Sequence, residues 1–142
     1  MKKAIAFIVA GILISSTIVA QADTAKPATA KVYFIRETGF VGSLINFRAK
    51  INDSVVCKMS NKRYSIHDIA PGNYTFYLTT WDMPKNKKNG LDLEVEAGKT
   101  YYLRMVIKQK FFENIIYYQE ITENSAAPLL AKCKLEENCG TD

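Results

Sequence analysis

Apolar and polar side chains alternate along much of the chain after residue 30, and the alternation is strictest at residues 91–96. There Leu91, Leu93 and Val95 fall on one face of an extended chain, and three acidic residues fall on the other. This period of two predicts a strand with one buried and one solvated face. Other segments are rich in β-branched and aromatic residues. The eight predicted strands are 31–37, 45–51, 54–59, 63–69, 74–80, 91–96, 100–108 and 115–121.

Compact turn segments separate these predicted strands. In the segment "IAPGNYTF", Pro71 presets φ and Gly72 accepts conformations that other residues resist, so we interpret both as structural turn residues. Gly98 lies in a similar turn. Eight strands at this spacing predict an all-β fold, an antiparallel β-sandwich or barrel. After them, Ser125 is suited to cap a short helix over residues 126–131.

The N-terminus has the pattern of a secretory signal peptide. Lys2 and Lys3 precede an uncharged apolar run at 4–20, and Ala20-Gln21-Ala22 is a small-residue cleavage site. We expect cleavage after Ala22, a periplasmic or secreted protein, and no transmembrane anchor after cleavage. The predicted organisation is a signal peptide at 1–22, a flexible leader at 23–30, a β-sandwich domain at 31–123, and a C-terminal helix and cysteine-bearing tail at 124–142.

Charge and cysteine content exclude some functions. The signal peptide holds two of the nineteen basic residues and none of the fourteen acidic ones, so the mature net charge is only +3. This is too small an excess to favour nucleic acid as a partner.

Cys133 and Cys139 are close enough in sequence to form a disulfide, with no bond as the alternative, and Cys57 is expected to be a buried apolar residue. With one histidine and no C-x-x-C pair, we expect no metal site and no cofactor.

Three segments resemble a known family: "KVYFIRETGFVGS", "RYSIHDIAPGNYTF" and "LEVEAGKTYYLRMV". Together they are similar to the small bacterial exported Domain of Unknown Function 2846, over about residues 30–123. The resemblance implies a prealbumin-like or immunoglobulin-like β-sandwich in the cell envelope. It implies no activity, and no family site is carried over to this chain.

Strands that cross the domain once and then reverse place alternate connections at opposite ends. The connections at 37–44, 60–63, 81–90 and 109–114 then share one end. Together with the strand residues that flank them, these connections carry seven basic and three acidic residues. The same end holds the aromatic residues Phe40, Trp81, Phe111 and Phe112. Cations among aromatic side chains suit an anionic, partly apolar surface. The alternative is a solvated lysine loop with the phenylalanines tucked beneath it. The predicted binding residues are Lys62, Arg63, Trp81, Lys85, Lys87, Lys88, Lys108, Lys110, Phe111 and Phe112.

No catalytic motif accompanies these residues. His67 shares a strand face with Ser65, but the adjacent Asp68 points to the opposite face and cannot orient the imidazole, so we expect a surface histidine. The predicted function is a non-enzymatic envelope binding module for a lipid headgroup, an acidic glycan or an envelope protein. The alternative is a hydrolase-type enzyme or an enzyme inhibitor whose site is not visible in the sequence.

Overall fold

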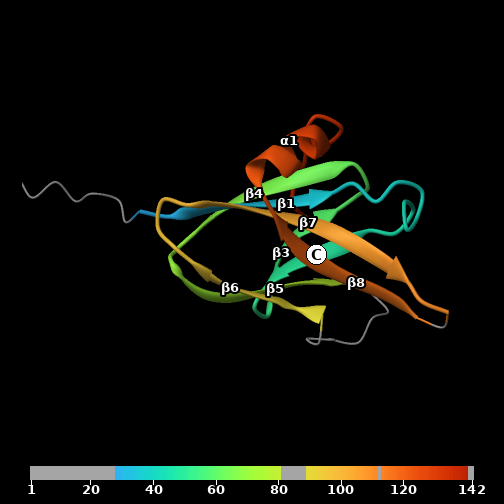
Figure 1. The fold of residues 1–142 in the computed structure, drawn as a ribbon, viewed down its shortest axis with the longest axis horizontal. Coiled ribbons are helices and arrows are strands. Elements are labelled where there is room, and N and C mark those ends of the chain that lie inside the picture. Colours follow the sequence, from blue (N-terminus) through green and yellow to red (C-terminus); the bar gives the residue numbers. More distant parts are fainter. Residues whose placement is uncertain (1–27, 81–88, 112, 141–142) are drawn as a thin grey trace, which may run out of the picture.

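The computed structural model describes residues 28–80, 89–111 and 113–140, which form an all-β sandwich with one short helix (Figure 1). One sheet has the strand order β8-β7-β1-β4-β9 and the other has the order β3-β2-β5-β6. The strands are β1 (Ala30–Arg36), β2 (Phe47–Ile51), β3 (Ser54–Met59), β4 (Arg63–Ile69), β5 (Gly72–Thr79), β6 (Leu91–Val95), β7 (Thr100–Gln109), β8 (Asn114–Ile121) and β9 (Lys134–Leu135).

The alternating pattern of the sequence becomes the core between the two sheets. Val32 and Phe34 of β1 are fully buried, and they pack with residues such as Phe76 of β5 and Leu103 of β7. The tyrosine doublets divide between the two faces of their sheet. Tyr118, for example, is 3 % exposed, while its neighbour on the chain lies on the outer face. The predicted β-sandwich is therefore confirmed.

Two strand pairings depart from the simple antiparallel arrangement. β1 lies between β4 and β7 and runs parallel to β7, while its pairing with β4 is antiparallel. The short β9 runs parallel to β4, with Arg63 opposite Lys134. The sequence did not predict β9, because two residues are too few to show an alternating pattern.

Helix α1 (Glu123–Leu130) begins earlier than expected. Its N-cap is Thr122, whose hydroxyl accepts a hydrogen bond from the backbone N–H of Ser125 at 3.4 Å. The predicted cap at Ser125 was therefore wrong. Ala126 is the buried residue of the helix, and Pro128 lies inside it. Among the described residues, no helix is long and apolar enough to cross a membrane.

Candidate functional site

Strand register places several connections at one end of the sandwich. Arg36 at the end of β1 lies opposite Arg63 at the start of β4, and Phe47 at the start of β2 lies opposite Met59 at the end of β3. Because β7 runs parallel to β1, the β7–β8 hairpin projects in the same direction (Figure 1). We call this the loop end, formed by the connections at 37–46, 60–62 and 110–113.

Apolar side chains at the loop end are open to solvent. Phe40 and Leu44 are each 98 % exposed, and Phe111 at the tip of the β7–β8 hairpin is 101 % exposed. Val41 and Ile45 are also exposed. Large apolar side chains clustered in the open on one face are typical of an interaction surface. Phe111 was among the predicted binding residues. Phe40 was predicted to lie at this end but was not among the binding residues. Val41, Leu44 and Ile45 were not predicted, because the prediction followed positive and aromatic side chains.

A buried arginine holds the 37–46 connection from beneath. Arg36 is 1 % exposed and donates from Nη2 to the carbonyl oxygen of Gly42 at 2.7 Å and from Nη1 to that of Met59. Its guanidinium lies 4.7 Å from the centre of the Phe47 ring. Burial lowers the pKa of Arg36 to about 10, so the side chain remains a cation at neutral pH. The connection is thereby attached to both sheets.

Asn61 fixes the same connection from its side. Its Oδ1 accepts hydrogen bonds from the backbone N–H of Thr38 at 3.2 Å and from the Thr38 hydroxyl at 3.1 Å, and its Nδ2 donates to the carbonyl of Gly39 at 2.7 Å. Gly42 has φ +69°, and a Cβ there would lie 3.2 Å from Cδ1 of Ile107. These contacts leave Phe40 pointing outward on a supported backbone rather than on a free loop.

The structure brings together only part of the predicted cationic set. Lys108 and Lys110 are exposed on the same hairpin as Phe111, with Lys108 Nζ 5.4 Å from the centre of the Tyr117 ring. Lys62 is exposed in the neighbouring turn. The remaining predicted residues Trp81, Lys85, Lys87, Lys88 and Phe112 lie outside the described residues.

Arg63 is engaged with the C-terminal tail. Its Nε lies 3.8 Å from Oε2 of Glu136, and its Nη1 donates to the carbonyl of Leu135 at 3.4 Å. The guanidinium is therefore turned toward β9. Sequence reasoning could not foresee this, because it did not predict that the tail would return to β4.

An open groove of about 580 Å³ lies beside the exposed apolar residues. Its largely apolar lining comes from the 37–46 connection and the β7–β8 hairpin, with further residues from β2, β3 and the segment after β5. The lining residues are Val41, Gly42, Ile45, Asn46, Phe47, Lys58, Thr80, Ile107, Asn114 and Ile116. Such a groove can accept an apolar group that approaches the loop end.

The predicted turns lie at the opposite end of the sandwich. Pro71 is in the connection between β4 and β5, and Gly72 is the first residue of β5. Gly98 has φ +77°, in the left-handed region that favours glycine, and its backbone N–H donates to the carbonyl of Thr29 at 3.0 Å.

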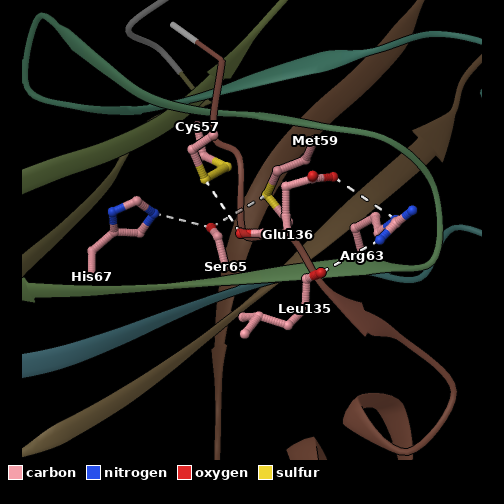
Figure 2. Close-up of a disulfide and its surroundings, with 8 residues drawn as sticks. Cys57, Met59, Arg63, Ser65, His67, Leu135 and Glu136 are labelled. Atoms are coloured by element: carbon pink, nitrogen blue, oxygen red, sulfur yellow. Dashed lines mark hydrogen bonds and ion pairs between the residues drawn. A yellow bond between two sulfur atoms is a disulfide. The ribbon is translucent and has the colours of Figure 1, made fainter.

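The cysteines pair differently from the prediction. Cys57 of β3 and Cys139 of the tail form a disulfide, and Cys133 is a free thiol (Figure 2). The predicted Cys133–Cys139 bond was wrong, because β9 returns the tail to β4 and carries Cys139 on to the fully buried Cys57. Cys133 instead lies 3.7 Å from the carbonyl oxygen of Arg36, and burial raises the pKa of its thiol.

His67 is half-buried rather than a surface histidine. Its Nε2 lies 3.0 Å from the Ser65 hydroxyl, and its ring meets the edge of Phe34 with centres 5.4 Å apart. Burial lowers the pKa of His67. Asp68 is on the other face of β4, where it lies 3.7 Å from Lys31 Nζ, so these residues do not form a hydrolytic triad.

The family model described as "protein of unknown function (DUF2846)" matches residues 26–120. The chain belongs to the DUF2846 family. No curated protein matches the chain. The DUF2846 match covers both apolar parts of the loop end, at 37–46 and 110–113, and it ends before the tail that holds Cys133 and Cys139. The disulfide therefore joins the DUF2846 region to a segment outside the match.

Proposed function

We propose that the protein is a non-enzymatic binding module of the bacterial cell envelope that contacts an anionic phospholipid surface through its loop end. The observation that carries the proposal is the nearly complete exposure of Phe40, Leu44 and Phe111 beside exposed lysines. Export to the envelope is part of the proposal and rests on the signal-peptide pattern of residues 1–22.

The chemistry of the loop end suits a headgroup region better than a closed ligand site. Each of the three side chains would contribute roughly 1.5–3 kcal/mol on full burial, and less in a partly hydrated interface. A lysine near an anionic membrane adds about 1 kcal/mol. Lys108 and Lys110 directly precede Phe111 on the hairpin, so the apolar tip and the cations would reach the same surface together.

Sedimentation with liposomes across a salt series tests this proposal. We expect the mature protein to sediment with anionic vesicles at low salt and to be released as salt increases, because salt screens exposed charges. Vesicles of neutral lipid should retain much less protein. Absence of binding to anionic vesicles at low salt would exclude the lipid surface and leave an acidic glycan or envelope protein as the candidate.

Two pairs of neutralising substitutions separate a local effect from one of net charge. Lys108→Gln with Lys110→Gln removes two exposed cations at the loop end. Lys31→Gln with Lys99→Gln removes two at the opposite end. The first pair should weaken binding at least tenfold and the second pair less than twofold. Equal losses would show that only the overall charge attracts the protein.

A further inference from the structure

A cluster of two cysteines and one histidine lies between the two sheets at one edge of the sandwich. Cys57 comes from β3, the edge strand of one sheet, and His67 comes from β4 of the other. Cys139 comes from the tail that follows β9. The two sulfur atoms and one imidazole nitrogen all lie within 4.8 Å of one another. Figure 2 shows His67 beside the disulfide, with Ser65 between His67 and Met59.

These three residues are the donor types of a zinc-type site. Thiolate and imidazole are the preferred ligands of Zn²⁺, and sites with three protein ligands keep a fourth position for water. Because each ligand comes from a different element, the sequence shows none of the paired spacings by which zinc sites are usually found. The structure therefore reveals a combination that the sequence argument against metal did not consider.

We propose that the Cys57–Cys139 disulfide closes a redox-gated metal site, and that the reduced protein binds one zinc-type cation through Cys57, Cys139 and His67. A dithiol reductant supplies two electrons and two protons. The S–S bond of the protein breaks to give two thiols, and the reductant becomes a disulfide. Zn²⁺ then forms two Zn–S bonds and one Zn–N bond, and the two thiol protons pass to the buffer.

After reduction, the largest movement that metal binding requires is the separation of the two sulfur atoms. A tetrahedral centre with ordinary Zn–S and Zn–N bonds holds its donor atoms about 3.5–3.8 Å apart. No separation in the cluster exceeds this by more than about 1 Å, and the two sulfur atoms, about 2 Å apart while bonded, must move apart by about 1.7 Å after reduction. Cys57 lies on β3, which pairs with β2, and His67 lies on β4, which pairs with β1, whereas Cys139 lies in the tail after β9. We therefore expect Cys139 to make most of the adjustment.

The neighbouring side chains favour binding at this position. The Ser65 hydroxyl, 3.0 Å from Nε2, holds the His67 ring beside the disulfide in the oxidised protein (Figure 2), and Nε2 exchanges this contact for the metal when the site fills. Cys139 and His67 are only half-buried, so water can reach the fourth coordination position. While the disulfide is intact, neither sulfur is a thiolate, and oxidation therefore closes the site.

Zinc titration of the full mature chain in both redox states tests the proposal. Cys133→Ser serves as the background, because it removes the other thiol. A phosphine reduces the disulfide with water, giving two thiols and a phosphine oxide, and is then removed without oxygen. Competition with a chromophoric zinc indicator should show one Zn²⁺ per reduced chain and none per oxidised chain. Absence of tight stoichiometric binding to the reduced chain would overturn the proposal.

Two variants identify the ligands in that background. His67→Gln should weaken Zn²⁺ binding at least tenfold, and Cys139→Ser should abolish it. Replacing Zn²⁺ with Co²⁺ should give the visible bands of a tetrahedral site with thiolate ligands, and His67→Gln should shift them. Unchanged affinity and spectra in His67→Gln would show that the thiols bind metal without the imidazole, contrary to the proposal.

The proposal can also be tested if the reduced chain does not fold without metal. Circular dichroism would be recorded for the reduced chain before and after Zn²⁺ addition. If the metal-free reduced chain is unfolded, a site that forms in the folded state must restore the β-sheet spectrum. An unfolded spectrum that Zn²⁺ does not change would contradict the proposal.

Discussion

Removal of the Cys57–Cys139 bond should produce a large and specific loss of stability. The bond ties the tail to β3, and the two cysteines are separated by 82 positions in the sequence. Without the bond, the unfolded chain has a higher conformational entropy, because its ends are no longer joined into a closed loop. The perturbation is the pair of substitutions Cys57→Ala and Cys139→Ala, made singly and together.

The magnitude follows from the length of the closed loop. Loop-closure entropy for a separation of 82 corresponds to about 4.5 kcal/mol at 25 °C. Native disulfides of small exported domains typically contribute about 2–5 kcal/mol, which brackets this value. For a domain of this size the loss would lower the Tm by roughly 15–20 °C.

The assay is guanidinium unfolding followed by circular dichroism. Each single variant already lacks the bond, so each should lose nearly as much stability as the double variant, to within about 1 kcal/mol. Cys133→Ala is the matched control, because it removes a half-buried free thiol and should cost less than about 1 kcal/mol. Losses that simply add in the double variant, or an equal loss for Cys133→Ala, would refute the Cys57–Cys139 pairing.

Three other predictions concern single residues. Gly42→Ala should cost more stability than Gly39→Ala in thermal unfolding, because both have positive φ but only Gly42 also lies close to Ile107; equal losses would contradict this. Burial raises the pKa of Tyr118, so the folded chain keeps a proton above pH 10 that the unfolded chain loses, and stability should fall as pH rises through that range. Tyr118→Phe should reduce this alkaline loss, and an unchanged pH dependence would count against it. The raised pKa of Cys133 should make its alkylation at pH 7.5 at least tenfold slower in the folded chain than in guanidinium, and equal rates would show an accessible thiol.

The strands were predictable because each carries its own local signal. Alternation and β-branched residues placed all eight longer strands close to their observed bounds, and the turn chemistry of Pro71 and Gly98 separated them. A local signal of this kind fails for β9, whose position depends on pairing with β4. The same distant pairing set the true partner of Cys139 and turned Arg63 toward the tail.

The candidate site was predictable only where charge marked it. Lys108, Lys110 and Phe111 lie within four positions of the sequence, so they could be recognised as a basic and aromatic cluster. The structure places them on one exposed hairpin. Phe40 was placed at this end only as an aromatic residue and Leu44 was not singled out, since an apolar residue in a connection is as easily buried as exposed. The backbone beside Phe40 is held by Asn61, which lies more than twenty positions further along the chain, and sequence patterns do not show such a contact.

Hydrogen exchange of the mature protein with and without anionic vesicles tests the central claim most directly, because it locates the contact. Slower exchange is predicted in peptides that cover the loop-end segments 37–46 and 109–114, with little change at the opposite turns 52–53 and 96–99. Phe40→Ser, Leu44→Ser and Phe111→Ser together should remove the protection without lowering the Tm, because all three side chains are exposed. Protection at the opposite turns, or no protection anywhere, would contradict a lipid-binding loop end.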